Sequence, residues 1–302
     1  MPELPEVESV RRQLDPELAG RRATDAWWDP HPALPRQFHD VDRLINRKIS
    51  HVGRRGKFLI APLDEGLELV MHLGMTGSFR LEDSNLFGDP AEPVSLFGDP
   101  AEPVSLFGDP AEPVSRKSRD PYARALVWLD DGRTLVFRDA RRFGRLAVVT
   151  AGLYTAIPTL AALGPEPLSD DFDPEVFAAL LARTRAPVKP YLLSQRPVAG
   201  VGNIYADEAL WIARIHPLSR RVGRRRAHAL HGAIRQVLAG AVEREGTTFR
   251  DYVMVNGESG RNASFLLAYG RGGEPCPRCG TALRKIVVGG RGTTYCPACQ
   301  RH

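Results

Sequence analysis

All four cysteines of the chain lie beyond residue 275, and their spacing restricts how this end can fold. They form two Cys-x2-Cys pairs, Cys276 with Cys279 and Cys296 with Cys299, separated by sixteen residues. This clustering argues against a disulfide framework, whereas each pair can aim two thiolates at one tetrahedral centre. The alternating run 285–288 between the pairs favours a hairpin ribbon. The sequence therefore predicts one structural zinc ion with these four cysteines as its ligands.

The first eight residues, Met-Pro-Glu-Leu-Pro-Glu-Val-Glu, have neither the basic start nor the apolar run of a secretion signal. Removal of the initiator methionine would expose Pro2 as a secondary α-amine, of which on the order of a tenth is unprotonated at neutral pH. Such an amine can attack an aldehyde carbon and form an iminium. Glu3 and Glu6 can share one helix face and act as acid or base beside the amine. The alternative is an ordinary helix start with Pro5 at its first position.

Composition places the chain among globular proteins, with a weak indication of an acidic partner. Its 302 residues suffice for about two domains, and 43% hydrophobic with 25% charged residues is ordinary for a buried core. No apolar run approaches the roughly 18 residues of a membrane span, which predicts a soluble protein. Lysine and arginine exceed aspartate and glutamate by 41 to 36, and arginine is concentrated at 220–221 and 224–226. This excess fits a polyanion such as nucleic acid without establishing one.

Apolar periodicity divides the chain into a strand-rich first half and a helical second half. A helix is expected over 5–14. Short β-branched and aromatic stretches follow, and the expected strands are 23–28, 48–53, 57–63, 67–73, 124–129, 134–138 and 145–149. Later helices are expected behind the capping residue Asp173, at 203–211 and at 224–244. The predicted fold class is α+β: an N-terminal antiparallel β-sandwich carrying a terminal helix, followed by a helical domain with the zinc ribbon.

Two segments allow two interpretations each. Residues 86–115 repeat Leu-Phe-Gly-Asp-Pro-Ala-Glu-Pro-Val-Ser three times, and their prolines and glycines exclude helix and ladder pairing. We expect a surface insert there, with a partner-docking arm as the alternative. Residues 199–202, Ala-Gly-Val-Gly, form a tight turn whose following backbone N–H groups suit a phosphate. The alternative is a plain helix connection.

With these motifs in view, the chain resembles the bacterial formamidopyrimidine-DNA glycosylase family, which removes oxidised purines such as 8-oxoguanine and nicks the abasic strand. The matching stretches follow the family's order from end to end: Pro-Glu-Leu-Pro-Glu-Val-Glu at 2–8, Gly-Arg-Arg-Gly-Lys at 53–57, His-Leu-Gly-Met at 72–75, Arg-Arg-Phe-Gly at 141–144, Leu-Gly-Pro-Glu-Pro-Leu at 163–168, Gly-Val-Gly-Asn-Ile-Tyr at 200–205 and the four-cysteine ribbon. Leu4 resembles the purine-directed branch, because the endonuclease VIII branch typically has glycine there.

The resemblance implies roles for single residues. The implied catalytic residues are Pro2 as nucleophile at C1′, Glu3 as acid/base on the sugar, Glu6 as a supporting carboxylate, and Lys57 as a phosphate-gripping lysine near the lesion. Met75, Arg141 and Phe143 match the side chains that enter the duplex and fill the space left by the flipped base. Without the resemblance, Met75 and Phe143 would be interpreted as core residues. The implied contacts to the DNA backbone are His72, Lys189, Asn203 and Arg291.

For the whole chain, the resemblance implies a bifunctional glycosylase and lyase that acts on duplex DNA through an N-terminal proline Schiff base with β,δ-elimination. The expected domains are a catalytic sandwich at 1–155, a helix-two-turn-helix domain at 156–265 and a zinc finger at 266–302. Residues 255–265 correspond to a loop over the flipped base. We expect a monomer in the bacterial cytosol, with zinc and no redox or nucleotide cofactor. The alternatives are an oxidised-pyrimidine glycosylase of the endonuclease VIII branch and a catalytically silent DNA-binding protein.

Overall fold

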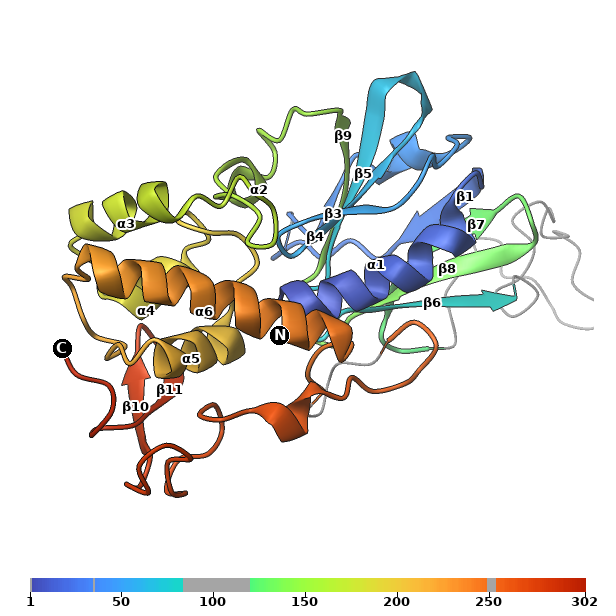
Figure 1. Ribbon diagram of the computed structural model, residues 1–302. Helices are drawn as coiled ribbons and strands as arrows, with labels where there is room; N and C mark the ends of the chain where they lie inside the picture. The colour runs from blue at the N-terminus through green and yellow to red at the C-terminus, as the bar shows by residue number, and fades with distance from the viewer. Residues whose placement is uncertain (1, 35, 84–119, 249–253) are drawn as a thin grey trace, which may run out of the picture.

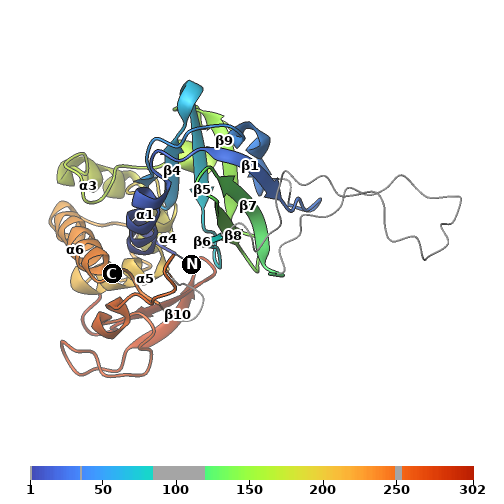
Figure 2. The same cartoon turned by 90° about the vertical axis from the view of Figure 1, so that its right-hand side faces the viewer.

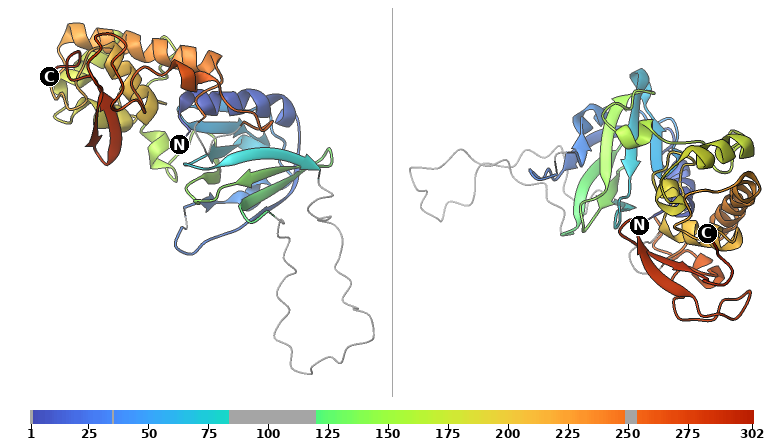
Figure 3. Two further views of the ribbon diagram at one scale, coloured as in Figure 1. Left: turned by 90° about the horizontal axis from the view of Figure 1, so that it is seen from below. Right: turned by 90° about the vertical axis from the view of Figure 1, so that its left-hand side faces the viewer.

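The computed structural model describes residues 2–34, 36–83, 120–248 and 254–302 (Figure 1). A half built from two β-sheets stands beside a helical half, and the first helix lies between them (Figures 2 and 3). The repeat at 86–115 lies outside the described residues, so its place as a surface insert stays a prediction. None of the helices within the described ranges is both long enough and apolar enough to cross a membrane.

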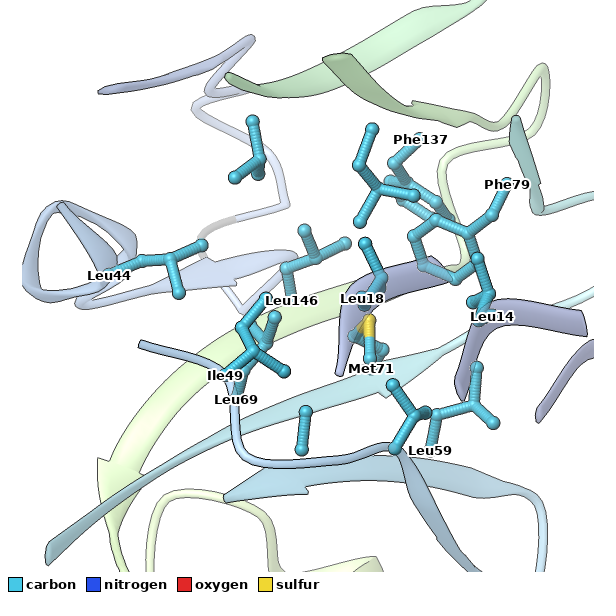
Figure 4. Close-up of a cluster of buried hydrophobic side chains, with 14 of the residues drawn as sticks. Leu14, Leu18, Leu44, Ile49, Leu59, Leu69, Met71, Phe79, Phe137 and Leu146 are labelled. Atoms are coloured by element: carbon cyan, nitrogen blue, oxygen red, sulfur yellow. The ribbon is translucent and has the colours of Figure 1, made fainter. Parts of the chain in front are cut away.

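The two sheets of the first half enclose one hydrophobic core, as expected of a sandwich (Figure 4). One sheet is antiparallel and has the order β1 (Ala23–Trp28), β7 (Ala123–Leu129), β8 (Arg133–Arg138), β6 (Ser78–Asp83). The other has the order β2 (Phe38–His39), β9 (Arg145–Thr150), β5 (Leu67–His72), β4 (Phe58–Pro62), β3 (Gly53–Arg55), and only the short pairing of β2 with β9 is parallel among the described strands. The predicted antiparallel sandwich is confirmed.

Three strand assignments differ from the prediction, and one of them is β2, a strand of only two residues that was not expected. The expected strand at 48–53 is wrong: Lys48 and Ile49 form only isolated bridges, and pairing resumes in β3 at Gly53. The buried side chains of Ile49 and Val52 produce the apolar signal there without a continuous ladder. Strand β6 was missed because Ser-Phe-Arg-Leu-Glu-Asp contains no β-branched residue.

Helix α1 (Leu4–Leu18) extends beyond its expected end at Leu14. Pro16 lies inside the helix and cannot donate a backbone hydrogen bond. Leu18, however, is completely buried in the sandwich core, and this burial favours the additional turn. The apolar face of α1 also includes Val7 and Val10, as the spacing predicts.

The helical half is formed by α2 (Pro158–Ala161), α3 (Pro174–Arg183), α4 (Val188–Leu193), α5 (Asn203–Ile212) and α6 (Arg224–Glu243), followed by the hairpin β10 (Arg284–Val288) and β11 (Arg291–Tyr295). Asp173 caps α3 as predicted, since its carboxylate accepts hydrogen bonds of 2.8 Å from the N–H groups of Glu175 and Val176. Helices α2 and α4 were not predicted because they are too short to show a periodic pattern. Leu4 belongs to the core of this half, so α1 contributes to both cores.

Candidate active site and zinc centre

The Glu3 carboxylate is buried at the N-terminal end of α5. Its oxygens accept hydrogen bonds from the backbone N–H groups of Gly202 and Ile204, both 2.8 Å, and of Tyr205, 3.3 Å. A helix N-terminus favours a negative charge at this position. These N–H groups follow the turn for which a phosphate was considered, and they hold a carboxylate of the same chain instead. The phosphate interpretation of this turn is therefore wrong.

The turn before α5 consists of glycines because the N-terminus packs directly on it. Gly200 has φ of +81°, and a Cβ there would lie 2.5 Å from the Leu4 side chain. A Cβ on Gly202 would collide with Glu3. Gln195 braces the turn by accepting a hydrogen bond of 2.7 Å from Gly200 N and donating one to Val201 O. The backbone thereby fixes Glu3 before any ligand is present.

Glu6 forms the second buried carboxylate, one helical turn after Glu3. It accepts hydrogen bonds from Glu3 N at 2.7 Å, from the Tyr205 hydroxyl at 2.5 Å and from Thr247 N at 2.7 Å. Burial, together with the charge of Glu3, raises the pKa of Glu6 to about 6. Pro2 is also buried and directly precedes Glu3, so its nitrogen lies next to this pair of carboxylates. The arrangement combines an amine position with two groups suited to acid and base chemistry.

Lys57 brings a cation to the two carboxylates. Burial lowers the pKa of the Lys57 ammonium, while the charges of Glu3 and Glu6 oppose this shift and that of Arg291 adds to it. The electrostatic coupling shows that α1, the start of β4 and the zinc hairpin converge on one site. Sequence reasoning selected all four of these residues, and the structure brings them together.

A hollow of about 490 Å³ opens beside this site between the two halves of the protein. Lys57, His72, Phe143 and Arg145 line it from the sheets, and the segment 193–196 lines it from the end of α4. Lys57, His72 and Phe143 are among the residues expected to act on DNA. Lys57 and Arg145 make the sheet side of the hollow basic. The shape and charge suit a nucleic-acid backbone.

His72 is prepared to donate a hydrogen bond at the edge of this hollow. Burial, followed by the charges of Lys57 and Arg145, lowers the pKa of His72 to about 4, so the ring is neutral at neutral pH. Its Nδ1 accepts a hydrogen bond of 3.0 Å from Gly74 N, which leaves the proton on Nε2. The ring also packs 4.7 Å from the Phe58 ring.

The wedge residues Met75, Arg141 and Phe143 lie on two turns that touch each other. Asp139, fully buried, accepts hydrogen bonds from Thr76 Oγ1 at 2.5 Å, Arg141 N at 3.2 Å and Gly144 N at 2.6 Å. A Cβ on Gly74 would collide with the backbone of Phe143 and Gly144. Asp139 therefore joins the two turns, a role that the sequence did not reveal.

The wedge residues project away from the core. Phe143 is 49% exposed, Arg141 is exposed, and Met75 is half-buried. The Arg141 guanidinium lies 5.1 Å from the centroid of the Phe143 ring. The interpretation of Phe143 as a core residue is therefore wrong, because about half of its ring is exposed.

Lys189 and Asn203 connect the helices to the zinc hairpin. Lys189 is fully buried, and its ammonium donates hydrogen bonds to Asp207 Oδ1 at 2.6 Å and Thr293 Oγ1 at 2.8 Å. The Asn203 amide donates one of 3.1 Å to Gly292 O. Arg291, next in the hairpin, is exposed. Lys189 thus holds β11 from inside the protein and does not present its charge to solvent. Its expected direct contact with DNA stays a prediction.

The segment expected to lie over a flipped base is anchored to the sandwich at its described beginning. Met254 is buried in the sandwich core, and Asn256 N donates a hydrogen bond of 3.2 Å to Gln13 Oε1 on α1. The other end returns to the site, because Asn262 Nδ2 donates to Thr247 Oγ1 at 3.0 Å.

Sequence reasoning missed Tyr205 and Thr247, although Tyr205 lies within a quoted motif.

The four cysteines fit the predicted zinc ion. Their Sγ atoms lie within 4.8 Å of one another, compared with about 3.8 Å expected for sulfurs at the corners of a tetrahedron with Zn–S bonds of about 2.3 Å. Cys299 N donates to Cys296 Sγ at 3.3 Å, and Gln300 Oε1 accepts from Cys296 N at 2.7 Å. β10 and β11 pair antiparallel between the two cysteine pairs. The chain has one structural zinc site in a ribbon, as predicted.

Comparison with known protein families agrees with this geometry. Residues 1–146 match the formamidopyrimidine-DNA glycosylase N-terminal domain, 163–253 the helix-two-turn-helix domain of the same enzymes, and 273–301 the zinc finger found in them and in isoleucyl-tRNA synthetases. The chain belongs to the formamidopyrimidine-DNA glycosylase family. The predicted family is therefore confirmed.

Full-length members of the family are similar over almost the whole chain. The formamidopyrimidine-DNA glycosylase of Deinococcus radiodurans is 42% identical over 313 aligned residues, covering 99% of this chain and 97% of its own length. The crystal structure of the Thermus thermophilus protein, 42% identical, superposes with a TM-score of 0.81 and covers 99% of this chain and 98% of its own. The Lactococcus lactis protein in complex with a Fapy-dG-containing DNA is 31% identical, with a TM-score of 0.79 and coverage of 99% and 100%.

Proposed function

We propose that this family member is a bifunctional DNA glycosylase and abasic-site lyase that excises oxidised purines from duplex DNA in the bacterial cytosol. The observation that carries the proposal is Glu3, held at the N-terminus of α5 directly after Pro2 and beside Glu6 and Lys57. The related Lactococcus lactis protein was solved with Fapy-dG DNA, which supports the same substrate class here.

In the proposed reaction the Pro2 amine attacks C1′ of the damaged nucleotide, and the glycosidic bond breaks with its electron pair leaving on the base. Glu3 exchanges protons with the sugar as the ring opens, and the product is an iminium between Pro2 and C1′. The iminium acidifies C2′, so loss of that proton expels the 3′ phosphate. A second elimination expels the 5′ phosphate, and water releases Pro2.

In this proposal Lys57 and His72 bind the phosphate groups of the DNA. The Lys57 ammonium supplies a fixed positive charge, and the His72 Nε2–H supplies a neutral donor at the same hollow. Met75, Arg141 and Phe143 enter the duplex, and Asn203 and Arg291 bind its backbone from the helical and zinc side. The wedge recovers part of the few kcal/mol that base flipping costs.

Two measurements test the proposal. Borohydride should trap a covalent protein–DNA adduct that maps to Pro2, and only in protein that has lost its initiator methionine, because an acylated nitrogen cannot form an iminium. Attachment at Lys57 would overturn the assignment. Duplexes with 8-oxoguanine and with thymine glycol separate the purine enzyme from a pyrimidine enzyme, and activity on neither would indicate a silent DNA-binding protein.

A further inference from the structure

A second basic hollow lies at the far end of the helical half, away from the site around Glu3. It measures about 500 Å³ and is lined by Pro187, Leu218, Ser219, Arg220, Arg221 and His302. The two arginine side chains are exposed, and neither forms an ion pair within the described part of the chain. The neighbouring Arg224, in contrast, is paired with Glu175 at 2.6 Å.

Ser219 is the buried residue among those that line the hollow. The residue is 3% exposed, and its Oγ has no hydrogen-bond partner among the described residues. Its backbone is fixed, because Ser219 N donates to His216 O at 2.9 Å and Ser219 O accepts from Val188 N at 2.8 Å. The start of the loop that carries Arg220 and Arg221 is thereby held in place.

We propose that this hollow, the distal basic site, binds phosphate groups of DNA outside the segment that carries the lesion. Two guanidinium groups and an imidazole on one concave surface offer the donors that phosphate oxygens accept. The inference rests on the proposed function, since it assigns these phosphates to the DNA on which the enzyme acts. It also accounts for the arginine run at 220–221, which the lesion site does not use.

The length of α6 sets how far from the lesion this contact lies. The distal basic site precedes its first residue, Arg224, whereas Gly246 and Thr247, which pack on Glu6, follow its last turn (Figure 1). With a rise of 1.5 Å per residue, the 20-residue helix is about 30 Å long. That length corresponds to about nine base pairs at 3.4 Å each. A duplex with five base pairs on each side of the lesion is too short to occupy both sites.

The test compares wild-type protein with R220Q/R221Q on an 11-base-pair and a 40-base-pair duplex, each with a central abasic-site analogue. The control R43Q/R183Q removes two exposed arginines outside the hollow. We expect wild type and control to bind the long duplex several-fold more tightly than the short one. R220Q/R221Q should lose most of this ratio, and its salt slope on the long duplex should fall by about 0.9 for each phosphate contact removed. R220K/R221K should keep most of the ratio because it keeps the charge.

The outcomes separate the sources of the phosphate and the two proposals. The wild type could bind two short duplexes per protein molecule while R220Q/R221Q binds only one. In that case the distal basic site contacts a separate DNA molecule, and the proposed site is still supported. If R220Q/R221Q matches the wild type on both duplexes and in stoichiometry, while thermal melting shows that it is folded, the distal basic site is wrong. If wild type binds neither lesion duplex more tightly than undamaged DNA, the proposed function fails instead.

Discussion

The hydroxyl of Tyr205 donates a hydrogen bond of 2.5 Å to Glu6 Oε1 and thereby links α5 to the first turn of α1. The same hydroxyl lies 3.0 Å from Thr247 Oγ1, which accepts a hydrogen bond from Asn262 Nδ2. Two donors from the helical half, the Tyr205 hydroxyl and Thr247 N, thus join Glu3 N on one carboxylate. They favour its ionised form against the burial that raises its pKa.

Tyr205→Phe should therefore change the pH dependence of excision. The hydroxyl lowers the pKa of Glu6, so its removal should raise that pKa above its value of about 6. If the reaction needs ionised Glu6, kcat/KM rises with pH through the pKa, and the rise should move to higher pH in the variant. Tyr191→Phe, at a half-buried tyrosine of the same domain, is the control and should keep the wild-type profile. An unshifted profile in Tyr205→Phe would show that Glu6 does not titrate in the reaction.

The wedge predicts different effects on two substrates. Phe143→Ala should slow excision of 8-oxoguanine from duplex DNA about tenfold or more, because the wedge no longer offsets the lost stacking. Cleavage of a preformed abasic site should change much less, since little flipping work remains. Val176→Ala removes another exposed apolar side chain, on α3, and should affect neither substrate. Equal loss on both substrates in Phe143→Ala would assign this ring a structural role.

The sequence predicted those parts of the fold that depend on local pattern. The apolar face of α1, the cap at Asp173 and the zinc ligands follow from residues close together in the chain. The partners of Glu3 and Glu6 could not be predicted in this way, because Gly202, Tyr205 and Thr247 are distant in sequence and only folding brings them near. Asp139 was missed for the same reason, because its hydrogen bonds join two turns that are distant from each other in the sequence. The resemblance identified the candidate site residues. It did not predict how deeply each is buried or which partners it has, as the buried ion pair of Lys189 with Asp207 shows.

Lys189 provides a test that separates positioning from direct DNA contact. Burial raises the pKa of its partner Asp207 to about 6, and removing the ammonium leaves that carboxylate unpaired. Lys189→Met should therefore cost about 3–5 kcal/mol in the free energy of unfolding and weaken DNA binding by loosening β11.

The double variant Lys189→Met/Asp207→Asn removes the unpaired charge and keeps an oxygen for Thr294 N, which donates to Asp207 Oδ2 at 2.8 Å. Stability in urea and DNA affinity should both recover in large part. If stability recovers while affinity stays low and the salt slope is reduced by about 0.9, Lys189 contacts a phosphate itself.

Cys296→Ser tests the dependence of DNA binding on zinc. Cys296 is completely buried at the metal site, and structural zinc can contribute roughly 10–16 kcal/mol of apparent binding energy to the folding of a small ribbon. Loss of one thiolate should release the metal, measured as one equivalent of zinc per chain in a colorimetric assay. The hairpin that carries Arg291 should then lose its shape, and affinity for an abasic-site duplex should fall at least tenfold.

The sandwich has its own core, so its near-ultraviolet circular dichroism from Trp128 should persist. Thr281→Ser, on the same ribbon, should retain both metal and affinity. Full DNA binding by a metal-free Cys296→Ser protein would show that the ribbon does not depend on zinc for this contact.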